Sequence, residues 1–188
     1  IPVIMMSGNE QATEQFYAQR IGADDFMKKP FSRPELFARI ERLLDADVKL
    51  GTSTPKADPS GDYAFLMFER IESTGAAPAG SAARLKDKAL QLTGGPNSPP
   101  PPPGRNVYSV MMAEGKADVF ITYCTNARLA QLEAAALQVL PVPEAINVSA
   151  RYGMAVVQPA SPQARRFAEF VLGATGQQRL AEVGFSAP

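Results

Sequence analysis

Hydrophobic and polar positions along the chain switch repeatedly between short apolar runs and longer amphipathic stretches. Residues 2–6 form a continuous apolar run, and residues 119–122 form a second stretch that is apolar up to its last residue, Thr122, as expected for strands buried in a parallel sheet. Residues 35–44 instead carry their apolar side chains on one helical stripe. This alternation predicts an α/β fold built from βα units around a largely parallel sheet.

Turn and cap residues divide residues 1–46 into strand, helix, strand and helix. Gly22 ends the first helix, and a short strand over residues 25–28 is closed by Lys29 and a following proline. Residues 32–35, Ser-Arg-Pro-Glu, form a capping box that opens the second helix.

The remainder of the chain continues the alternation. A strand at 48–50 is followed by a polar turn at 51–55 and by a helix capped at Ser60. Residues 74–82 form a loop, and residues 96–104, with five consecutive prolines, form a stiff loop or a recognition motif. The other expected elements are a helix leading into a strand at 85–92, helices at 106–114 and 127–135, strands at 119–122, 137–140 and 149–157, and two helices after Ser161.

The composition excludes several functional classes. With 19 basic and 19 acidic residues in 188, and no basic patch, we expect no nucleic-acid binding. Membrane insertion is not expected, since no run approaches roughly 18 apolar residues, and no signal peptide is expected at the start.

The absence of histidine removes Ser-His-Asp and Cys-His catalysis and imidazole metal sites. Cys124 is the single cysteine, so it forms no intrachain disulfide. We therefore predict a protein that is not an enzyme and has no catalytic residue, metal or cofactor.

Small polar side chains gather where the predicted strands end. Several neutral N–H and O–H donors that converge at helix starts can bind a tetrahedral oxyanion without a counter-charge. The alternative for each residue is structural: helix caps for the threonines and serines, a core position for the tyrosine, and a solvated loop for the arginine. The candidate ligand-binding residues are Thr52, Ser53, Arg105, Asn106, Thr122 and Tyr152.

The second part of the chain resembles a known family. The stretch GKADVFITYCTNA, with the later ARYGMAVV and ARRFAEFVLGATGQQRLAEVGF, resembles the second half of a periplasmic solute-binding protein of the molybdate/tungstate type. The resemblance implies a lobe of the type 2 periplasmic-binding fold, an ABC transporter permease as partner, and a periplasmic location. It also implies that Arg105–Asn106, Thr122 and Tyr152 are second-lobe ligands.

The beginning of the chain resembles a different family. The combination MMSG … GADDFMKKPF … ELFARIERLL is similar to the C-terminal part of a response-regulator receiver domain, a flavodoxin-like and cytoplasmic class. The resemblance places Ser7, Phe26 and Lys29 at that family's switch positions. The strands that carry its phosphoacceptor are not matched, which favours a structural role for the three residues.

Together these patterns predict a chimera of two α/β fragments. We expect a receiver-like segment at 1–46, a second lobe at 47–146, and a return strand with C-terminal helices at 147–188. Residues 1–46 either complete a lobe with 147–188 or add their strands beside residues 48–50. The predicted function is oxyanion binding, weakened or lost because the first-lobe ligands are missing. The alternatives are a signalling or interaction module without its phosphoacceptor, or an engineered chimera with no activity.

Overall fold

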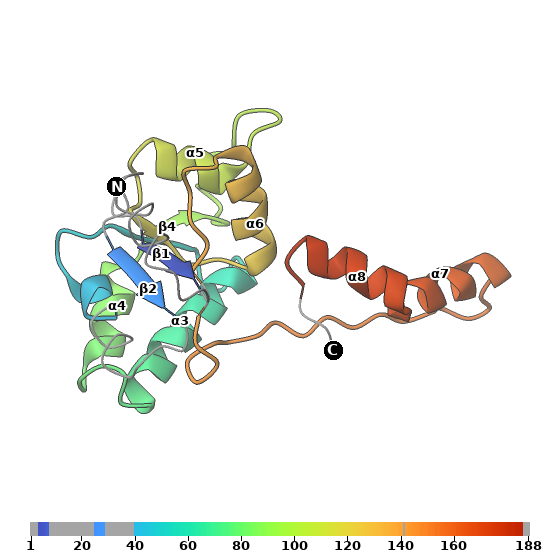
Figure 1. Cartoon of the computed structure of the whole chain (residues 1–188), viewed down its shortest axis with the longest axis horizontal. Helices are drawn as coiled ribbons and strands as arrows, with labels where there is room; N and C mark the ends of the chain where they lie inside the picture. The colour runs from blue at the N-terminus through green and yellow to red at the C-terminus, as the bar shows by residue number, and fades with distance from the viewer. Residues whose placement is uncertain (1–3, 8–24, 29–39, 141, 186–188) are drawn as a thin grey trace.

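A three-stranded parallel sheet lies at the centre of the part that the computed structural model describes, residues 4–7, 25–28, 40–140 and 142–185 (Figure 1). Strand β3 (Leu50–Ser53) lies between β4 (Leu90–Thr93) and β5 (Val119–Phe120). Gly51 of β3 is in register with Leu90 on one side and with Phe120 on the other, and both pairings are parallel. The carboxyl ends of the three strands therefore meet at one edge, which we call the carboxyl edge. The predicted α/β fold with a parallel sheet is confirmed.

Three helices are each the next element after a strand of this sheet, so their first turns lie near the carboxyl edge. Helix α3 follows β3, α5 follows β4 after the proline-rich loop, and α6 follows β5. Helix α4 instead leads into β4. The helices are α3 (Pro59–Ser73), α4 (Ser81–Lys88), α5 (Val107–Ala113), α6 (Cys124–Glu133), α7 (Pro162–Leu172) and α8 (Ala174–Glu182).

The hydrophobic core lies between β3, α3 and α4. Phe68 and Ile71 recur at helical spacing on α3, and both side chains are fully buried. They pack in one cluster with Leu50 of β3 and Leu85 of α4. Ile40, in a helical turn before the sheet, joins the same cluster and ties residues 40–44 to it.

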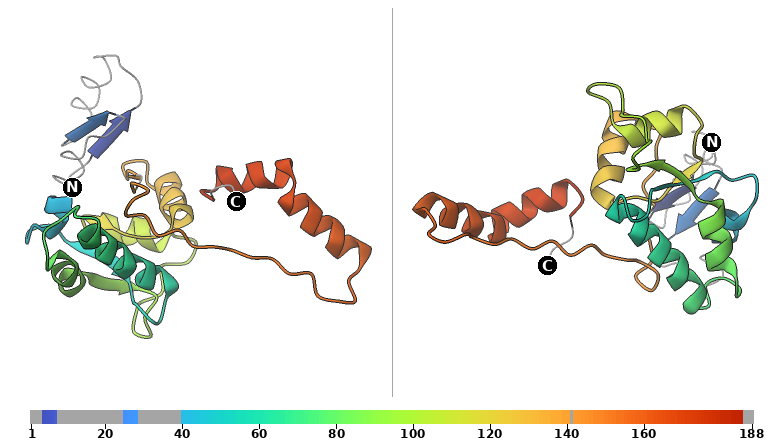
Figure 2. Two further views of the ribbon diagram at one scale, coloured as in Figure 1. Left: turned by 90° about the horizontal axis from the view of Figure 1, so that it is seen from below. Right: turned by 180° about the vertical axis from the view of Figure 1, so that it is seen from behind.

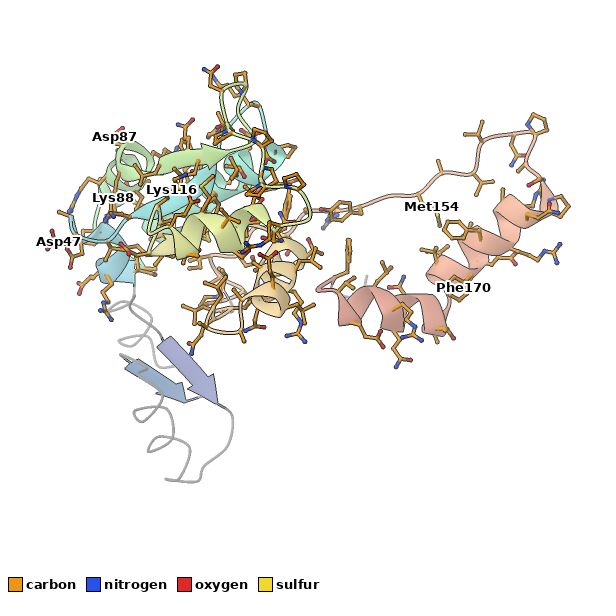
Figure 3. All side chains as sticks on the ribbon, turned by 90° about the horizontal axis from the view of Figure 1, so that it is seen from above. Asp47, Asp87, Lys88, Lys116, Met154 and Phe170 are labelled. Atoms are coloured by element: carbon orange, nitrogen blue, oxygen red, sulfur yellow. The ribbon has the colours of Figure 1, made fainter. Side chains whose placement is uncertain are left out.

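The C-terminal part runs away from the sheet and then returns (Figures 1 and 2). The chain before α7 is extended without strand pairing, and α7 buries none of its residues in the described structure. Figure 3 shows Met154 of the extended segment and Phe170 of α7 on this arm. The chain comes back after α8, where a Cβ on Gly184 would lie 3.0 Å from the carbonyl of Cys124 at the start of α6.

Near the N-terminus, β1 (Ile4–Ser7) and β2 (Asp25–Lys28) form a parallel pair of their own. Their register aligns Ile4 with Asp25 and Ser7 with Lys28. β2 has the predicted bounds, and β1 overlaps the predicted run at 2–6 but continues through Ser7. The predicted first helix, the capping box at 32–35 and Lys29 lie outside the described residues, and the predicted domain boundaries stay predictions.

Several predicted elements need correction. Residues 51–53, predicted as a polar turn, belong to β3, because the burial of this strand between two neighbours outweighs its polar composition. Helix α3 begins at Pro59 with Asp58 as its cap, and Ser60 lies inside it. The predicted strands at 137–140 and 149–157 have no strand pairing, since an apolar run without a neighbouring edge remains an extended chain.

Candidate functional site

At the carboxyl edge, two adjacent hydroxyl residues of β3 differ in how they are used. Both Thr52 and Ser53 are fully buried. The Ser53 hydroxyl lies 3.0 Å from that of Thr93 and links β3 to β4. The Thr52 hydroxyl has no partner among the described residues, and neither has that of Ser60 in the first turn of α3. A buried hydroxyl without a partner costs about 1–3 kcal/mol, so Thr52 is a candidate ligand donor.

A carboxylate of the chain itself, that of Glu133, is bound at the start of α5. Glu133, the last residue of α6, accepts hydrogen bonds from Arg105 Nε at 2.6 Å, from the Asn106 backbone N–H at 2.6 Å and from Ser109 Oγ at 2.7 Å. These bonds, led by the one from Ser109, lower the pKa of Glu133 to about 2. The carboxylate is therefore ionised at neutral pH, and the sequence-predicted residues Arg105 and Asn106 already bind an anion that belongs to the chain.

The Asn106 side chain caps the same helix. Its Oδ1 accepts from the backbone N–H groups of Tyr108 at 3.0 Å and Ser109 at 3.2 Å. Because Asn106 satisfies two of the unpaired N–H groups of the first turn, it fixes the direction of α5. The ring of Tyr108 is buried and packs edge-on against Phe120, with centroids 5.0 Å apart.

Asn126 connects this helix to the end of β5. Its Nδ2 donates to the Tyr108 hydroxyl at 2.9 Å and to the Thr122 hydroxyl at 3.1 Å. Thr122 was predicted from the sequence as a ligand residue, whereas Tyr108 was not in the predicted set. Three elements thus place polar side chains together: α5, the residues after β5, and the first turn of α6.

Of the three helices that begin at this edge, α6 is the one whose first turn has no side-chain cap. Tyr123 occupies the N-cap position and makes no side-chain cap hydrogen bond, whereas Asp58 and Asn106 cap α3 and α5. The first N–H groups of α6 therefore lack a side-chain acceptor, and the helix dipole adds partial positive charge there. An anion beside Thr122 would meet these groups.

Aromatic hydroxyls surround the same helix start. Burial, with smaller contributions from the nearby acidic groups of Tyr152, Tyr63, Asp58 and Tyr108, raises the pKa of Tyr123 to about 12. The Tyr123 hydroxyl therefore keeps its proton at neutral pH. Tyr152 is thus within electrostatic reach of the start of α6, although 67% of it is exposed and its ring packs edge-on against Phe185 at 5.4 Å.

The structure thus separates the predicted site residues into groups. Thr52, Ser53 and Thr122 lie at the carboxyl edge, Tyr152 lies near the start of α6, and Arg105 and Asn106 lie at the start of α5. Of the receiver-like positions, Ser7 ends β1, Phe26 lies in β2, and Lys29 is outside the described residues. No cluster of three or more metal-ligating side chains occurs in the described ranges.

A separate hollow of about 400 Å³ lies beside the proline-rich loop. Thr54, Gln91, Ser98 and Lys116 are among its lining residues, and Figure 3 labels Lys116. The Lys116 ammonium is paired with the Glu114 carboxylate at 2.7 Å, so its charge is already matched. Across the described segments, no helix is both long and apolar enough to cross a membrane.

Comparison with known proteins gives relatives for both parts of the chain. The family model described as bacterial extracellular solute-binding protein matches residues 21–186. The uncharacterized protein PM1146 of Pasteurella multocida is 36% identical over 144 residues, which cover 76% of this chain and 57% of that protein. This chain therefore spans little more than half of that relative.

Response regulators match shorter stretches. The alkaline phosphatase synthesis transcriptional regulatory protein SphR of Synechococcus elongatus is 36% identical over 93 residues, 50% of this chain and 32% of that protein. The response regulator SaeR of Staphylococcus aureus is 48% identical over 44 residues, 23% of this chain and 19% of that protein. No solved structure matches the chain.

Proposed function

Since this chain belongs to the family of bacterial extracellular solute-binding proteins, we propose that its solute is a tetrahedral oxyanion of the molybdate or tungstate type. The proposed binding region is the carboxyl edge between β3, the residues after β5, and the start of α6. The proposal concerns binding and transfer of the solute and involves no chemical conversion.

One observation carries this proposal. The hydroxyl of Thr52 is fully buried at the carboxyl end of the central strand and has no partner in the described residues. Buried polar groups in proteins are almost always hydrogen-bonded, so an unpaired one at a strand end suggests a ligand. Ligands of open parallel sheets bind outside the carboxyl ends of the strands, and Thr52 is the residue before the last one of β3.

The donors after β5, at the carboxyl edge, are neutral, which suits an oxyanion. Thr122 and Tyr123 offer hydroxyls, and the start of α6 offers backbone N–H groups without a side-chain cap. Arg105, before α5, is 2.6 Å from Glu133, which matches its charge. A dianion held by hydrogen bonds and a helix dipole needs no opposite charge in contact with it.

The described residues supply one side of such a site. By the family resemblance, a solute is held between two lobes, and the first lobe contributes further hydroxyl ligands. We therefore expect this chain to bind its oxyanion more weakly than a complete two-lobed protein would. An ABC transporter permease is the proposed partner that receives the solute.

A second candidate is an interaction module formed by the N-terminal segment, favoured by the relatives among response regulators. Incubation with a small phosphodonor tests it. We expect no covalently bound phosphate, because the strands that would carry a receiver's phosphoacceptor are not recognised in this sequence. Stoichiometric phosphorylation would favour the signalling module instead.

Thermal unfolding with a panel of anions tests the proposed site. At 100 times its Kd, a ligand specific for the folded state adds about 2.7 kcal/mol, which is about 5–11 °C in Tm for a chain of this size. Molybdate and tungstate should raise Tm above the level reached with chloride at equal ionic strength.

The variant Thr122→Val should reduce this increase, because it removes a hydroxyl at the carboxyl edge. Thr74→Val makes the same chemical change at the C-cap of α3, and it should leave the increase intact. An equal Tm with chloride and molybdate, in a chain that unfolds cooperatively, would count against the proposed solute.

A further inference from the structure

The C-terminal arm, residues 153–183, carries apolar side chains that nothing in the described structure covers. Helix α7 buries none of its residues, and Figure 2 shows the arm standing away from the sheet. Four large apolar residues of the arm are more than half exposed: Val157, Phe167, Phe170 and Leu172. Contiguous apolar surface of this kind marks an interaction site on a protein.

Contacts within the arm hold α7 and α8 together. Gly176 of α8 lies against the backbone of Phe170, where any side chain would collide. The Nε2 of Gln177 donates to the Val171 carbonyl at 2.9 Å across the same junction. Phe170 is therefore presented from a fixed helix end, which reduces the conformational entropy that is lost when a partner covers it.

A hollow of about 390 Å³ lies on the arm beside the first half of α7. The extended segment and α7 line it together, with Met154, Val156, Val157, Ala164, Phe167 and Ala168 among its residues. These side chains are apolar, so the hollow suits an apolar group. Phe170 lies in the second half of α7 and is not among the lining residues. The arm thus carries an apolar hollow and, next to it, an exposed aromatic side chain that does not fill it.

The charges on α7 follow the same order along the helix. Arg166, Glu169 and Phe170 lie three and four positions apart and so share one face of α7. Arg166 and Glu169 are exposed, and neither is ion-paired with another described residue. Arg166 belongs to the half of α7 that borders the hollow, and Glu169 lies beside Phe170. A second α7 lying antiparallel would therefore place Arg166 opposite the partner's Glu169, and Phe170 opposite the partner's hollow.

We infer that this face is covered by a second copy of the chain, in a two-fold dimer whose antiparallel α7 helices each insert Phe170 into the hollow of the other copy. The same patch serves on both copies, and the contact forms two pairs between Arg166 and Glu169. A second copy is favoured over a membrane surface because the face combines a hollow with charges of both signs, whereas helices that lie on membranes carry a basic polar face. The inference goes beyond the proposed function, and the carboxyl edge takes no part in it.

The interface should be small. Met154 and the four exposed residues named above, at roughly 100 Å² apiece from each copy, bury about 1,000 Å² in total, which is low for a specific contact. We therefore expect a transient dimer with a dissociation constant on the order of 100 µM. At the low micromolar concentrations of an unfolding experiment, the arms are then uncovered.

Sedimentation equilibrium of the full chain, from about 10 to about 500 µM, tests the dimer. The average mass should rise from that of one chain towards that of two. Phe170→Ser should weaken association by at least about tenfold, because it removes the group that fills the hollow. In Glu169→Arg, Arg166 faces a like charge across the interface, and the dissociation constant should rise by about tenfold.

A double variant separates the proposed pairing from a general effect of charge. Arg166→Glu alone should weaken the dimer as Glu169→Arg does. The two changes together restore both pairs in reverse and should return the dissociation constant to within about threefold of the wild-type value. Glu144→Arg makes the same charge change at an exposed residue outside the arm and should leave the dimer unchanged. All four positions are exposed, and circular dichroism checks that each variant is folded.

Four results would overturn the inference. The first is a wild-type chain that stays monomeric at about 500 µM. The second is a dimer that Phe170→Ser and Glu169→Arg leave unchanged, since association would then use another surface. The third is a double variant that remains as weak as the single ones. The fourth is a monomer that binds vesicles of phosphatidylglycerol and phosphatidylcholine through the arm. Molybdate binding decides none of these results, so the proposed function is tested separately.

Discussion

Replacing Gly61 by alanine probes how closely α3 approaches the end of β3. A Cβ at this position would lie 2.5 Å from the carbonyl oxygen of Ser53, 2.6 Å from the nitrogen of Pro55 and 2.7 Å from the carbonyl carbon of Thr54. All three are backbone atoms, so no side-chain rotation relieves the contact. The start of α3 would have to move away from the carboxyl edge.

The size of the effect follows from these distances. Ordinary van der Waals contact begins near 3.4 Å, so the helix start must shift by roughly 0.9 Å. Overpacking of this kind costs about 1–3 kcal/mol, and contact with three backbone atoms places Gly61→Ala at the upper end. Alanine recovers about 1 kcal/mol of helix propensity, which leaves a net loss of about 2 kcal/mol.

Thermal unfolding followed by circular dichroism measures this loss. We expect Tm to fall by about 4–8 °C for a chain of this size. Gly153→Ala is the matched control, because a Cβ there meets no atom within 4 Å. It should leave stability unchanged or raise it by up to about 1 kcal/mol. A Gly61→Ala variant that melts at or above the wild-type Tm would refute the close packing of α3 against the end of β3 and the turn that follows it.

Three further predictions concern the core, a helix cap and pH. Phe68→Ala should lower the free energy of unfolding in urea by about 3–5 kcal/mol, because Phe68 is fully buried. Phe167→Ala, at a residue 63% exposed, should lower it by less than about 0.5 kcal/mol. Similar losses in the two variants would contradict the exposed position of α7. Asp58→Ala removes the side chain that caps α3 by accepting from the Ser60 N–H at 2.9 Å. It should lower the free energy of unfolding, measured in urea, by about 1 kcal/mol. An unchanged unfolding midpoint would contradict this cap. Hydrogen bonds lower the pKa of Glu133 from 4.5 to about 2, so its stabilising effect is complete above pH 4.5 and is lost as the pH falls towards 2. The wild-type Tm should therefore drop more steeply over this range than that of Glu133→Gln, and parallel curves would exclude the effect.

The fold class was predictable because it depends on local patterns. Apolar runs separated by amphipathic helices indicated a parallel α/β sheet, and the pairing of β3 with β4 and β5 confirms it. The extent of β3 was not predictable, because Gly51, Thr52 and Ser53 have the composition of a turn. Their burial depends on β4, whose Thr93 pairs with Ser53 across 40 positions of sequence.

The candidate site was predictable only in part for the same reason. Thr122 stood out because small polar residues follow an apolar run. The roles of Tyr108 and Asn126 depend on a hydrogen bond across 18 positions, and that of Glu133 depends on one across 27. A sequence pattern does not show which helix end faces which loop, so these contacts required the structure.

Isothermal titration of molybdate into the full chain, at constant ionic strength, tests oxyanion binding most directly. The proposed function predicts a saturable isotherm with one site per chain, weakened when the Thr52 hydroxyl is removed in Thr52→Val. Thr74→Val should reproduce the wild-type isotherm. A chain that unfolds cooperatively yet gives no heat with molybdate, tungstate or sulfate would contradict the proposal that this solute-binding protein takes an oxyanion.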